Sequence, residues 1–362
     1  MRPFDPQQDR AVRARHPRAG SFGPDEDPWT VQEAAWPASG PAEDRLRFLL
    51  RYAILAPSSH NTQPWRFGVH DAGVDVFSDP ARALPVVDPD ERELIVSCGA
   101  AIFHLRVAAA RFGWTARVVP FPAPKDPTLL ARVELAPGPP DPALAALLPS
   151  IPRRHTARIG FEPRALDPEL VGRLRAAARA EGAWLEVVEE IERRRAVARL
   201  VAWGDKAQSA DPGFRHELAR WLRPNHPERR DGIPGYALGL SDVAARVGPM
   251  VVRTFDLGKG HAARDLELAE SSPALLVLGT ALDGRCSWLA AGQALAHVLL
   301  RLTAEGAVAS FLNQPIEVPR LRPTLTSLVG ATGAAQLLLR AGYGPPGPAT
   351  PRRPLTEVLI RT

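Results

Sequence analysis

Two apolar segments of this chain are related by a constant spacing of 193 residues, and this repeat constrains the fold more than any other feature. Shifting residues 93–113 by that spacing aligns four pairs: Gly99 with Gly292, Ala101 with Ala294, His104 with His297, and Gly113 with Gly306. Upstream of each segment, an apolar helical stripe precedes a strand that begins near a tryptophan. One such alignment can arise by chance in an alanine-rich chain. The shared order of helix, strand, strand and helix favours duplication.

The spacing of apolar residues predicts an α+β chain. Helices are expected over residues 46–55, 93–112, 169–180, 190–201 and 288–305. Strands are expected over residues 65–69, 74–77, 114–119, 131–135, 183–188, 273–278 and 336–341. We therefore predict two related units, each a small and mostly antiparallel sheet flanked by helices. The long helices at 93–112 and 288–305 should lie at the centre, on a pseudo-twofold axis.

Proline and arginine divide the chain into parts. Residues 1–40 are rich in Pro, Arg and Asp, which predicts a loose N-terminal arm. A stretch rich in Pro and Ala then separates a first unit, residues 41–150, from a second unit, residues 151–362. Within the second unit, residues 203–270 form a longer tract than a connection between strands requires, which indicates a lid.

Composition argues against several classes of protein. The formal net charge is +5, but no run of five basic residues occurs, so we expect a solvated arginine-rich surface and no nucleic-acid partner. No run of 18 apolar residues occurs, so no membrane span is expected. Cys98 and Cys286 both lie in apolar segments, where we expect them to fill core space without a bridge. A reducing, cytoplasmic compartment is the corresponding prediction.

Six consecutive polar residues, 58–63, lie between a helix that Pro57 should end and a strand. Nothing in this stretch requires a core. Its groups suit the edge of a polar ligand, namely the hydroxyls of Ser58 and Ser59 and the amides of Asn61 and Gln63. An ordinary connection between a helix and a strand is the alternative.

Arginine is concentrated at two further places. The second unit opens with Arg153, Arg154, His155, Thr156 and Arg158, and the C-terminal tail holds Arg352 and Arg353. Guanidinium groups form planar, charged, bidentate contacts that suit a phosphate dianion. In a chain so rich in arginine, a solvated cluster and a basic tail are the alternatives.

These segments resemble the nitroreductase superfamily. Residues 56–65, Ala-Pro-Ser-Ser-His-Asn-Thr-Gln-Pro-Trp, are similar to the loop that lines one edge of flavin mononucleotide (FMN) in that family. The arginine segment at 153–158 resembles the one that begins the family's flavin-binding half. The tail at 342–354 resembles the closing segment, whose basic residue returns to the phosphate. A weaker similarity links residues 313–317, Asn-Gln-Pro-Ile-Glu, to a stretch along the flavin face.

The resemblance implies specific roles. Arg154 and Thr156 would meet the FMN phosphate and ribityl chain, and Arg158 would lie near the flavin N1 and C2 carbonyl. Pro315, Ile316 and Glu317 would follow the flavin face. Ordinary members are homodimers with flavin at the subunit interface, whereas here each half-site motif occurs once. The chain therefore resembles the Acg-like branch, a fused pseudo-dimer that acts as a monomer with one FMN site.

Two functional hypotheses follow from the resemblance. In the first, NAD(P)H reduces FMN, which passes two electrons to a nitroaromatic, a quinone or a similar small acceptor. In the second, the protein sequesters FMN behind a closed lid. We name no catalytic side chain, because the flavin carries the chemistry. The chain has no Walker or Rossmann glycine motif, no zinc-ligand spacing and no nucleophile elbow, so we expect no metal site.

Overall fold

The computed structural model describes residues 27–139, 141–256 and 258–360. The first unit contains α2 (Ala42–Ala53), β1 (Trp65–His70), β2 (Gly73–Ser78), α3 (Arg92–Arg111), β3 (Trp114–Pro120) and β4 (Leu129–Pro137). Residues 1–26 of the expected arm lie outside the described part. The rest of the arm forms two 3₁₀ turns, in which the ring of Trp36 stacks on Phe112 at 4.5 Å between centroids.

The second unit repeats this order with insertions. Its corresponding elements are α5 (Pro168–Ala180), β5 (Trp184–Val188), β8 (Ala274–Thr280), α10 (Arg285–Ala304), β9 (Ala307–Phe311) and β10 (Ala334–Tyr343). Between β5 and β8 lie α6 (Ile191–Ala210), α7 (Pro212–Trp221), β6 (Leu222–Arg223), β7 (Ile233–Pro234), α8 (Asp242–Thr254) and α9 (Gly258–Ser271). Three short helices complete the unit: α11 (Gln314–Glu317), α12 (Arg322–Leu328) and α13 (Leu355–Val358).

The two four-stranded sheets have the same topology. Their orders are β1-β2-β4-β3 and β5-β8-β10-β9, and all of these pairings are antiparallel. Each strand of the first sheet thus has a counterpart at the same place in the second. The prediction of an α+β fold made of two related halves is confirmed. The expected helix at 190–201 was too short, because α6 continues to Ala210.

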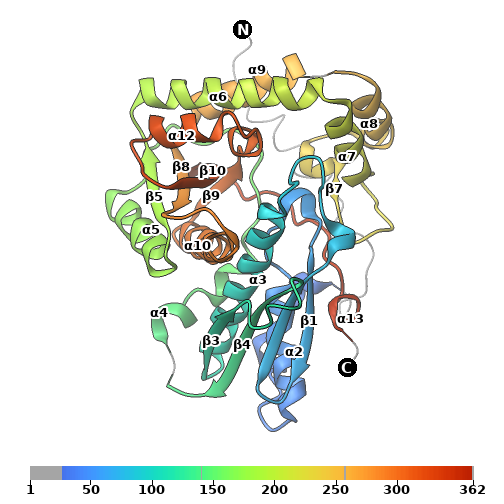
Figure 1. Ribbon diagram of the computed structural model, residues 1–362, viewed down its shortest axis with the longest axis vertical. Coiled ribbons are helices and arrows are strands. Elements are labelled where there is room, and N and C mark those ends of the chain that lie inside the picture. Colours follow the sequence, from blue (N-terminus) through green and yellow to red (C-terminus); the bar gives the residue numbers. More distant parts are fainter. Residues whose placement is uncertain (1–26, 140, 257, 361–362) are drawn as a thin grey trace.

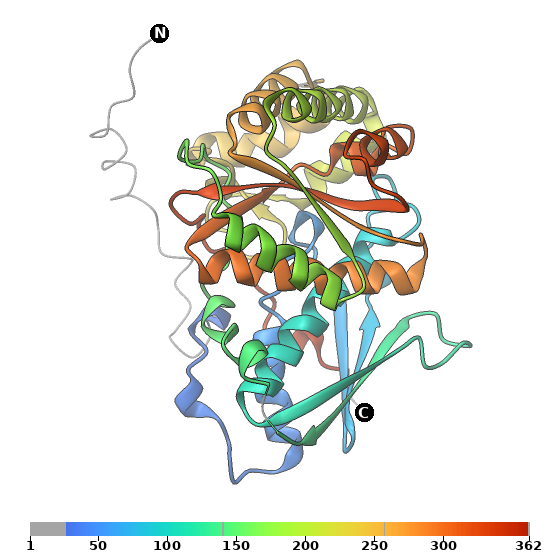
Figure 2. The same ribbon diagram turned by 90° about the vertical axis from the view of Figure 1, so that its left-hand side faces the viewer.

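Helices α3 and α10 cross between the two sheets (Figures 1 and 2). At the crossing, a Cβ on Gly99 would lie 3.0 Å from the Cα of Gly292, and a Cβ on Gly292 would lie 2.9 Å from the Cα of Gly99. The backbone of each helix therefore fills the space that a side chain of the other would need. This reciprocal contact is what a twofold interface requires, and it joins the residues that the 193-residue spacing aligned.

Burial differs between the sheets. The second sheet is covered on one face by α5 and α10 and on the other by α6 and α12 (Figure 1). The first sheet packs against α2 and α3. Helix α3 is long and apolar enough to cross a membrane, but it is almost wholly enclosed by protein and serves as a core helix. Cys98 on α3 is buried as expected, whereas Cys286 is exposed, so the prediction that it fills core space is wrong.

The tract at 203–270 is mostly regular structure. It comprises the end of α6, helices α7 to α9 and a two-stranded ribbon of β6 and β7. The tract is fastened to the first unit, because the Glu217 carboxylate accepts hydrogen bonds from the backbone of Val86 and Val87 at 3.0 and 2.9 Å. The C-terminal segment also returns to the first unit, where Ile360 N donates to Phe67 O at 2.8 Å.

Candidate functional site

A cavity of about 640 Å³ lies where the two units and the tract at 203–270 meet. The first unit contributes residues 57–61 and the start of α3. The second contributes residues 154–156, 158, 310–314, 317, 348, 350 and 352, together with side chains from α6 to α10 and β10. This volume is in the range of small-molecule and cofactor sites. Segments that are far apart in sequence, 57–61 and 154–158, therefore form one wall.

The polar loop adopts an unusual backbone conformation. His60, Asn61 and Gln63 have φ angles of 50°, 54° and 54°, which lie in the left-handed region. A residue other than glycine costs roughly 1–3 kcal/mol in such a sparsely populated conformation, so the surroundings must hold it there. Gln63 N donates to Ser58 Oγ at 2.9 Å, and Gln63 Oε1 accepts from Arg353 N at 2.7 Å. The loop is thus fixed by its own hydroxyl and by the C-terminal tail.

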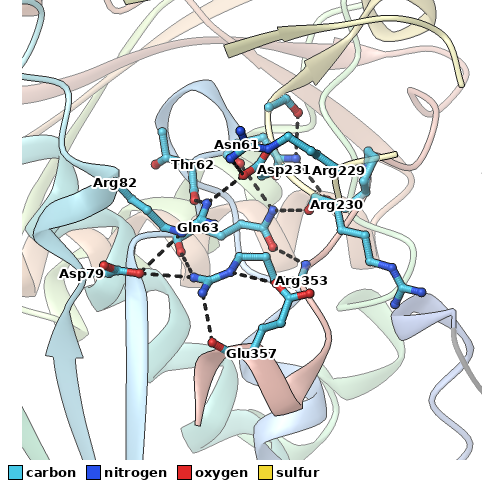
Figure 3. Close-up of polar contacts among 12 residues, drawn as sticks. Asn61, Thr62, Gln63, Asp79, Arg82, Arg229, Arg230, Asp231, Arg353 and Glu357 are labelled. Carbon is cyan, nitrogen blue, oxygen red and sulfur yellow. Dashed lines mark hydrogen bonds and ion pairs between the residues drawn. The ribbon is translucent and has the colours of Figure 1, made fainter. Parts of the chain in front are cut away.

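Asn61 joins three segments of the chain. Its Nδ2 donates to Gly232 O at 2.9 Å and to Pro351 O at 3.0 Å, and its Oδ1 accepts from Arg352 Nη1 at 2.8 Å. Figure 3 shows the same loop tied to the 229–231 segment and to Arg353. We had expected this amide to present a donor and an acceptor to the flavin ring. In the structure, both amide protons are already bound within the protein.

The cavity lining includes four arginines: Arg154, Arg158, Arg340 and Arg352. The Asp265 carboxylate acts on Arg158 and Arg340, whereas no carboxylate of the described residues accompanies Arg154 or Arg352. Arg154 and Arg352 are 5% and 3% exposed, and both donate to Leu55 O at 3.4 Å. Their guanidinium groups therefore lie close together with no anion between them. Buried charges are normally paired, so this arrangement points to an anionic ligand.

The electrostatics of these arginines agrees with that inference. Burial lowers the pKa of Arg154 to about 10, and burial also lowers the pKa of Arg340 to about 10. The pKa of Arg352 is lowered first by burial and then by the nearby charge of Arg154. Each shift measures how poorly the protein alone stabilises these cations. A bound dianion would stabilise the charged form of these arginines and would raise their pKa values again.

Trp29 of the N-terminal arm covers this group of cations. Its indole Nε1 donates to Thr350 O at 2.9 Å, and the Arg352 guanidinium lies 4.7 Å from its ring centroid. The ring of His155 meets it edge-on at 4.6 Å. Sequence reasoning missed Trp29 because the arm carries no periodic pattern. In sequence, Trp29 also lies far from the residues that it contacts in space.

Some predicted residues do not line the cavity. Ser58, Ser59, Asn61, Arg154, His155, Thr156, Arg158, Glu317 and Arg352 line it, whereas Gln63, Arg153, Pro315, Ile316 and Arg353 do not. Arg153 is exposed, and its Nε donates to Pro149 O at 3.0 Å. Arg353 lies 3.6 Å from Asp79 and 3.5 Å from Glu357, so carboxylates already accompany it (Figure 3). Pro315 and Ile316 are buried behind the wall.

Acidic groups occupy another part of the wall. Ser59 Oγ donates to Glu93 Oε2, and Gln208 Nε2 donates to Glu317 Oε2 at 2.5 Å. Burial raises the pKa of Glu317 well above its usual value, and the Glu93 carboxylate raises it further. Burial and the nearby Glu93 carboxylate therefore favour the protonated form of Glu317. Burial and Arg158 lower the pKa of His60 to about 4, so that its imidazole is neutral.

Sequence reasoning also missed Arg340 and Asp205. Arg340 lies in β10, where it follows three leucines, and is 1% exposed. A charged residue inside such a strand was a usable signal, because isolated buried charge is costly. Asp205 lies on α6 beyond the predicted end of that helix and gave no signal. No group of three or more His, Cys, Asp or Glu residues that could hold a metal occurs within the described ranges.

Comparison with known proteins identifies relatives of this chain. No family model matches it. A candidate NAD(P)H nitroreductase of Mycobacterium tuberculosis is 37% identical over 325 residues, which are 88% of this chain and 92% of that relative. The M. tuberculosis protein named NAD(P)H nitroreductase acg is 33% identical over 327 residues, 87% of this chain and 95% of the relative.

Solved structures show lower similarity. The FMN- and NADPH-dependent nitroreductase NfnB of a sphigopyxis sp. strain matches 60% of this chain and 98% of its own, at 19% identity and a TM-score of 0.40. The relatives in sequence carry the assignment, because more than a third of the aligned residues are identical along nearly the whole chain. This chain therefore belongs to the nitroreductase superfamily, in the Acg-like branch.

Proposed function

We propose that this protein is an FMN-dependent NAD(P)H oxidoreductase that passes two electrons to a nitroaromatic, a quinone or a similar small acceptor. One observation carries the proposal: Arg154 and Arg352 are buried side by side on the cavity wall without a carboxylate partner. A phosphate monoester supplies the charge and the acceptor oxygens that such a pair requires. The names of the sequence relatives agree with this assignment.

The residues of the wall fit FMN from one end to the other. Arg154, Arg352 and Thr156 would hold the phosphate, with Trp29 and His155 covering it. Arg158 and Arg340 would place positive charge near the part of the ring where negative charge grows on reduction. Ser59 Oγ, which donates its proton to Glu93, would lie along the ring as an acceptor, and Glu317, whose neutral form burial favours, would lie there as a donor.

Bound FMN would supply the hydride and electron chemistry between NAD(P)H and the acceptor. The protein would bind and orient it, and would exclude water by means of the apolar side chains of α7 and α8. Glu317 retains its proton because burial and Glu93 disfavour its charged form. It is therefore the wall residue best suited to supply a proton.

We propose one FMN per chain in a monomeric pseudo-dimer. The place in the second unit that corresponds to the polar loop is the short connection Glu181–Ala183. There Glu181 accepts a hydrogen bond from Arg106 and lies 3.4 Å from His297. The Arg106 guanidinium and the Glu181 carboxylate compensate each other's charge, which disfavours a second flavin here. Cytoplasmic location accords with two cysteines that form no bridge.

Sequestration of FMN is the second candidate. The observation that favours it is the attachment of the 203–270 tract to the first unit through Glu217, and through Asp231, whose carboxylate lies 3.0 Å from Arg82. A closed tract would keep NAD(P)H away from the ring. Stopped-flow mixing of the yellow protein with NADPH separates the candidates: bleaching within seconds supports an oxidoreductase, and none over minutes supports storage.

The cofactor proposal has a direct test with a matched control. Purified protein is denatured, and the released flavin is identified by chromatography and quantified by absorbance, with one FMN per chain expected. Arg154→Ala should weaken FMN binding tenfold or more, since hydrogen bonds to charged groups are worth about 1.5–3 kcal/mol. The exposed neighbour variant Arg153→Ala should bind FMN normally. Equal affinities for both variants would remove Arg154 from the phosphate site.

A further inference from the structure

One part of the cavity is an apolar annex. The tract at 203–270 builds it from α7, β7, the 3₁₀ turn Gly235–Leu238 and α8. Its lining side chains include Phe214, Leu218, Ile233, Leu238, Val247 and Val251. These side chains have no polar atoms, so they offer nothing to a phosphate or a ribityl chain. They suit a flat apolar molecule next to the flavin site.

Two polar side chains, Asp205 and Gln314, also belong to the lining of the cavity. Gln314 Nε2 donates to Asp205 Oδ1 at 3.0 Å and to Asp265 Oδ2 at 2.8 Å. The two carboxylates fix the orientation of the Gln314 amide, because only its NH₂ group can face both of them. The second carboxylate oxygen of Asp205, Oδ2, and the amide oxygen of Gln314, Oε1, are buried and have no hydrogen-bond partner in the described part of the structure. Asp205 is 7% exposed and lines the cavity.

Both unpartnered atoms are hydrogen-bond acceptors. A ligand group that satisfies them must carry at least two N–H donors, and a positive charge suits the Asp205 carboxylate. Among the described residues, the charged groups that line the cavity with Asp205 include Asp265, Glu317, Arg158, Arg264 and Arg340. Asp265 acts electrostatically on Asp205, Arg158 and Arg340. A hydroxyl offers one proton, and an anion would face the carboxylates. A protonated amine fulfils both conditions.

We propose that the annex binds an apolar, ring-bearing electron acceptor with a protonated amine, whose N–H groups donate to Asp205 Oδ2 and Gln314 Oε1. This inference rests on the proposed function, because it specifies the acceptor of the same site. Asp205 acts as a specificity-determining residue: the apolar side chains hold the ring, and the carboxylate selects the charge.

The protonation of Asp205 gives the proposal a pH signature. Burial, and then the Asp265 carboxylate, raise the pKa of Asp205 to about 7. The carboxylate is therefore charged above neutral pH and protonated below it. Affinity for a cationic ligand should increase between pH 6 and pH 8, whereas affinity for a neutral ligand of the same shape should change little.

Three probes of one shape test the proposal: 4-nitrobenzylamine, 4-nitrobenzyl alcohol and 4-nitrobenzoate. Their dissociation constants are measured by calorimetry at pH 8 on the full chain, with its flavin content recorded. We expect the amine to bind tenfold or more tightly than the alcohol, on the scale of a charge-assisted hydrogen bond. The benzoate should bind most weakly.

Asp205→Asn keeps an acceptor for Gln314 and removes the charge, so it should abolish the preference for the amine. Glu192→Gln, at an exposed position on the same helix, should retain the preference. Equal affinities for amine and alcohol in the unaltered protein, or an undiminished preference in Asp205→Asn, would overturn the proposal. A protein that lacks FMN but still prefers the amine would refute the flavin function and leave the annex assignment standing.

Discussion

The two halves of this molecule connect their first helix and first strand in opposite ways. In the first unit, the connection 54–64 contains the polar loop 58–63, in which three residues have positive φ angles. In the second unit, Glu181–Ala183 turns directly from α5 into β5. There Arg106 and His297 accompany the Glu181 carboxylate. The same topology therefore carries an open site on one side and a closed charge cluster on the other.

This difference shows how a duplicated fold can keep one site. A ligand site requires polar groups that the protein itself leaves unpaired, and those groups lower stability. A half without a ligand has no reason to retain them. Glu181, Arg106 and Gln293 satisfy one another, since Arg106 Nη1 also donates to Gln293 Oε1 at 2.9 Å. We therefore expect substitutions in the second connection to change stability and those in the first to change ligand binding.

The largest effect is expected for Glu181→Ala. This change leaves Arg106 and His297 without their carboxylate, and removing one partner of a largely buried ion pair costs about 3 kcal/mol. Urea unfolding followed by circular dichroism gives the free energy of unfolding. FMN content should be unchanged. A loss of FMN with intact stability would show that the second connection also serves the ligand site.

The same pair predicts a pH dependence of stability. Burial acts to raise the pKa of Glu181, but His297 and Arg106 outweigh it and hold the pKa below its usual value of 4.5. The contribution of this carboxylate to the free energy of unfolding is therefore fully present above pH 4.5. It is lost as the pH falls through the lower pKa of the folded state. The difference in unfolding free energy between the unaltered protein and Glu181→Ala should shrink below pH 4.5. A constant difference down to pH 3 would contradict this assignment.

The two arginines of the tail, Arg352 and Arg353, should have different roles. Arg352 lines the cavity without a carboxylate, and Arg352→Ala should weaken FMN binding tenfold or more. Arg353 is accompanied by Asp79 and Glu357, so Arg353→Ala should lower the unfolding free energy and leave FMN affinity within about threefold. Flavin fluorescence quenching and thermal unfolding measure the two quantities. Equal losses of affinity would return both residues to the phosphate site.

Asn61→Leu tests whether the polar loop holds the 229–232 segment. The change removes the bonds from Asn61 Nδ2 to Gly232 O and Pro351 O and leaves buried acceptors unpaired, at about 1–3 kcal/mol. Hydrogen exchange at residues 229–232 should become faster by about tenfold, on the same scale. His60→Gln serves as the control, because no hydrogen bond of the described structure depends on His60 Nδ1. Unchanged exchange in Asn61→Leu would mean that other contacts hold the tract.

The smallest effect is expected for Trp29→Ala. Stacking of Trp29 on Arg352 is worth about 1 kcal/mol at a partly buried site, which corresponds to about a fivefold loss of FMN affinity. The loss should appear as faster FMN release in stopped-flow fluorescence, because the indole covers the phosphate end. Trp36→Ala, in the same arm but packed on Phe112, should leave the release rate unchanged.

The sequence by itself determined the repeated units and the central helices, and it suggested candidate residues for a phosphate site. Local patterns suffice for these, because apolar periodicity and helix-ending glycines act within a few residues; Gly113 and Gly306 do have φ angles of 76° and 74°. Only the tertiary structure distinguished Arg352 from Arg353 and Arg154 from Arg153. Neighbours in sequence face different surroundings, and whether a charge is paired depends on side chains that are far away along the chain. For the same reason, no local signal placed Asp205 on the cavity wall or Trp29 against Arg352.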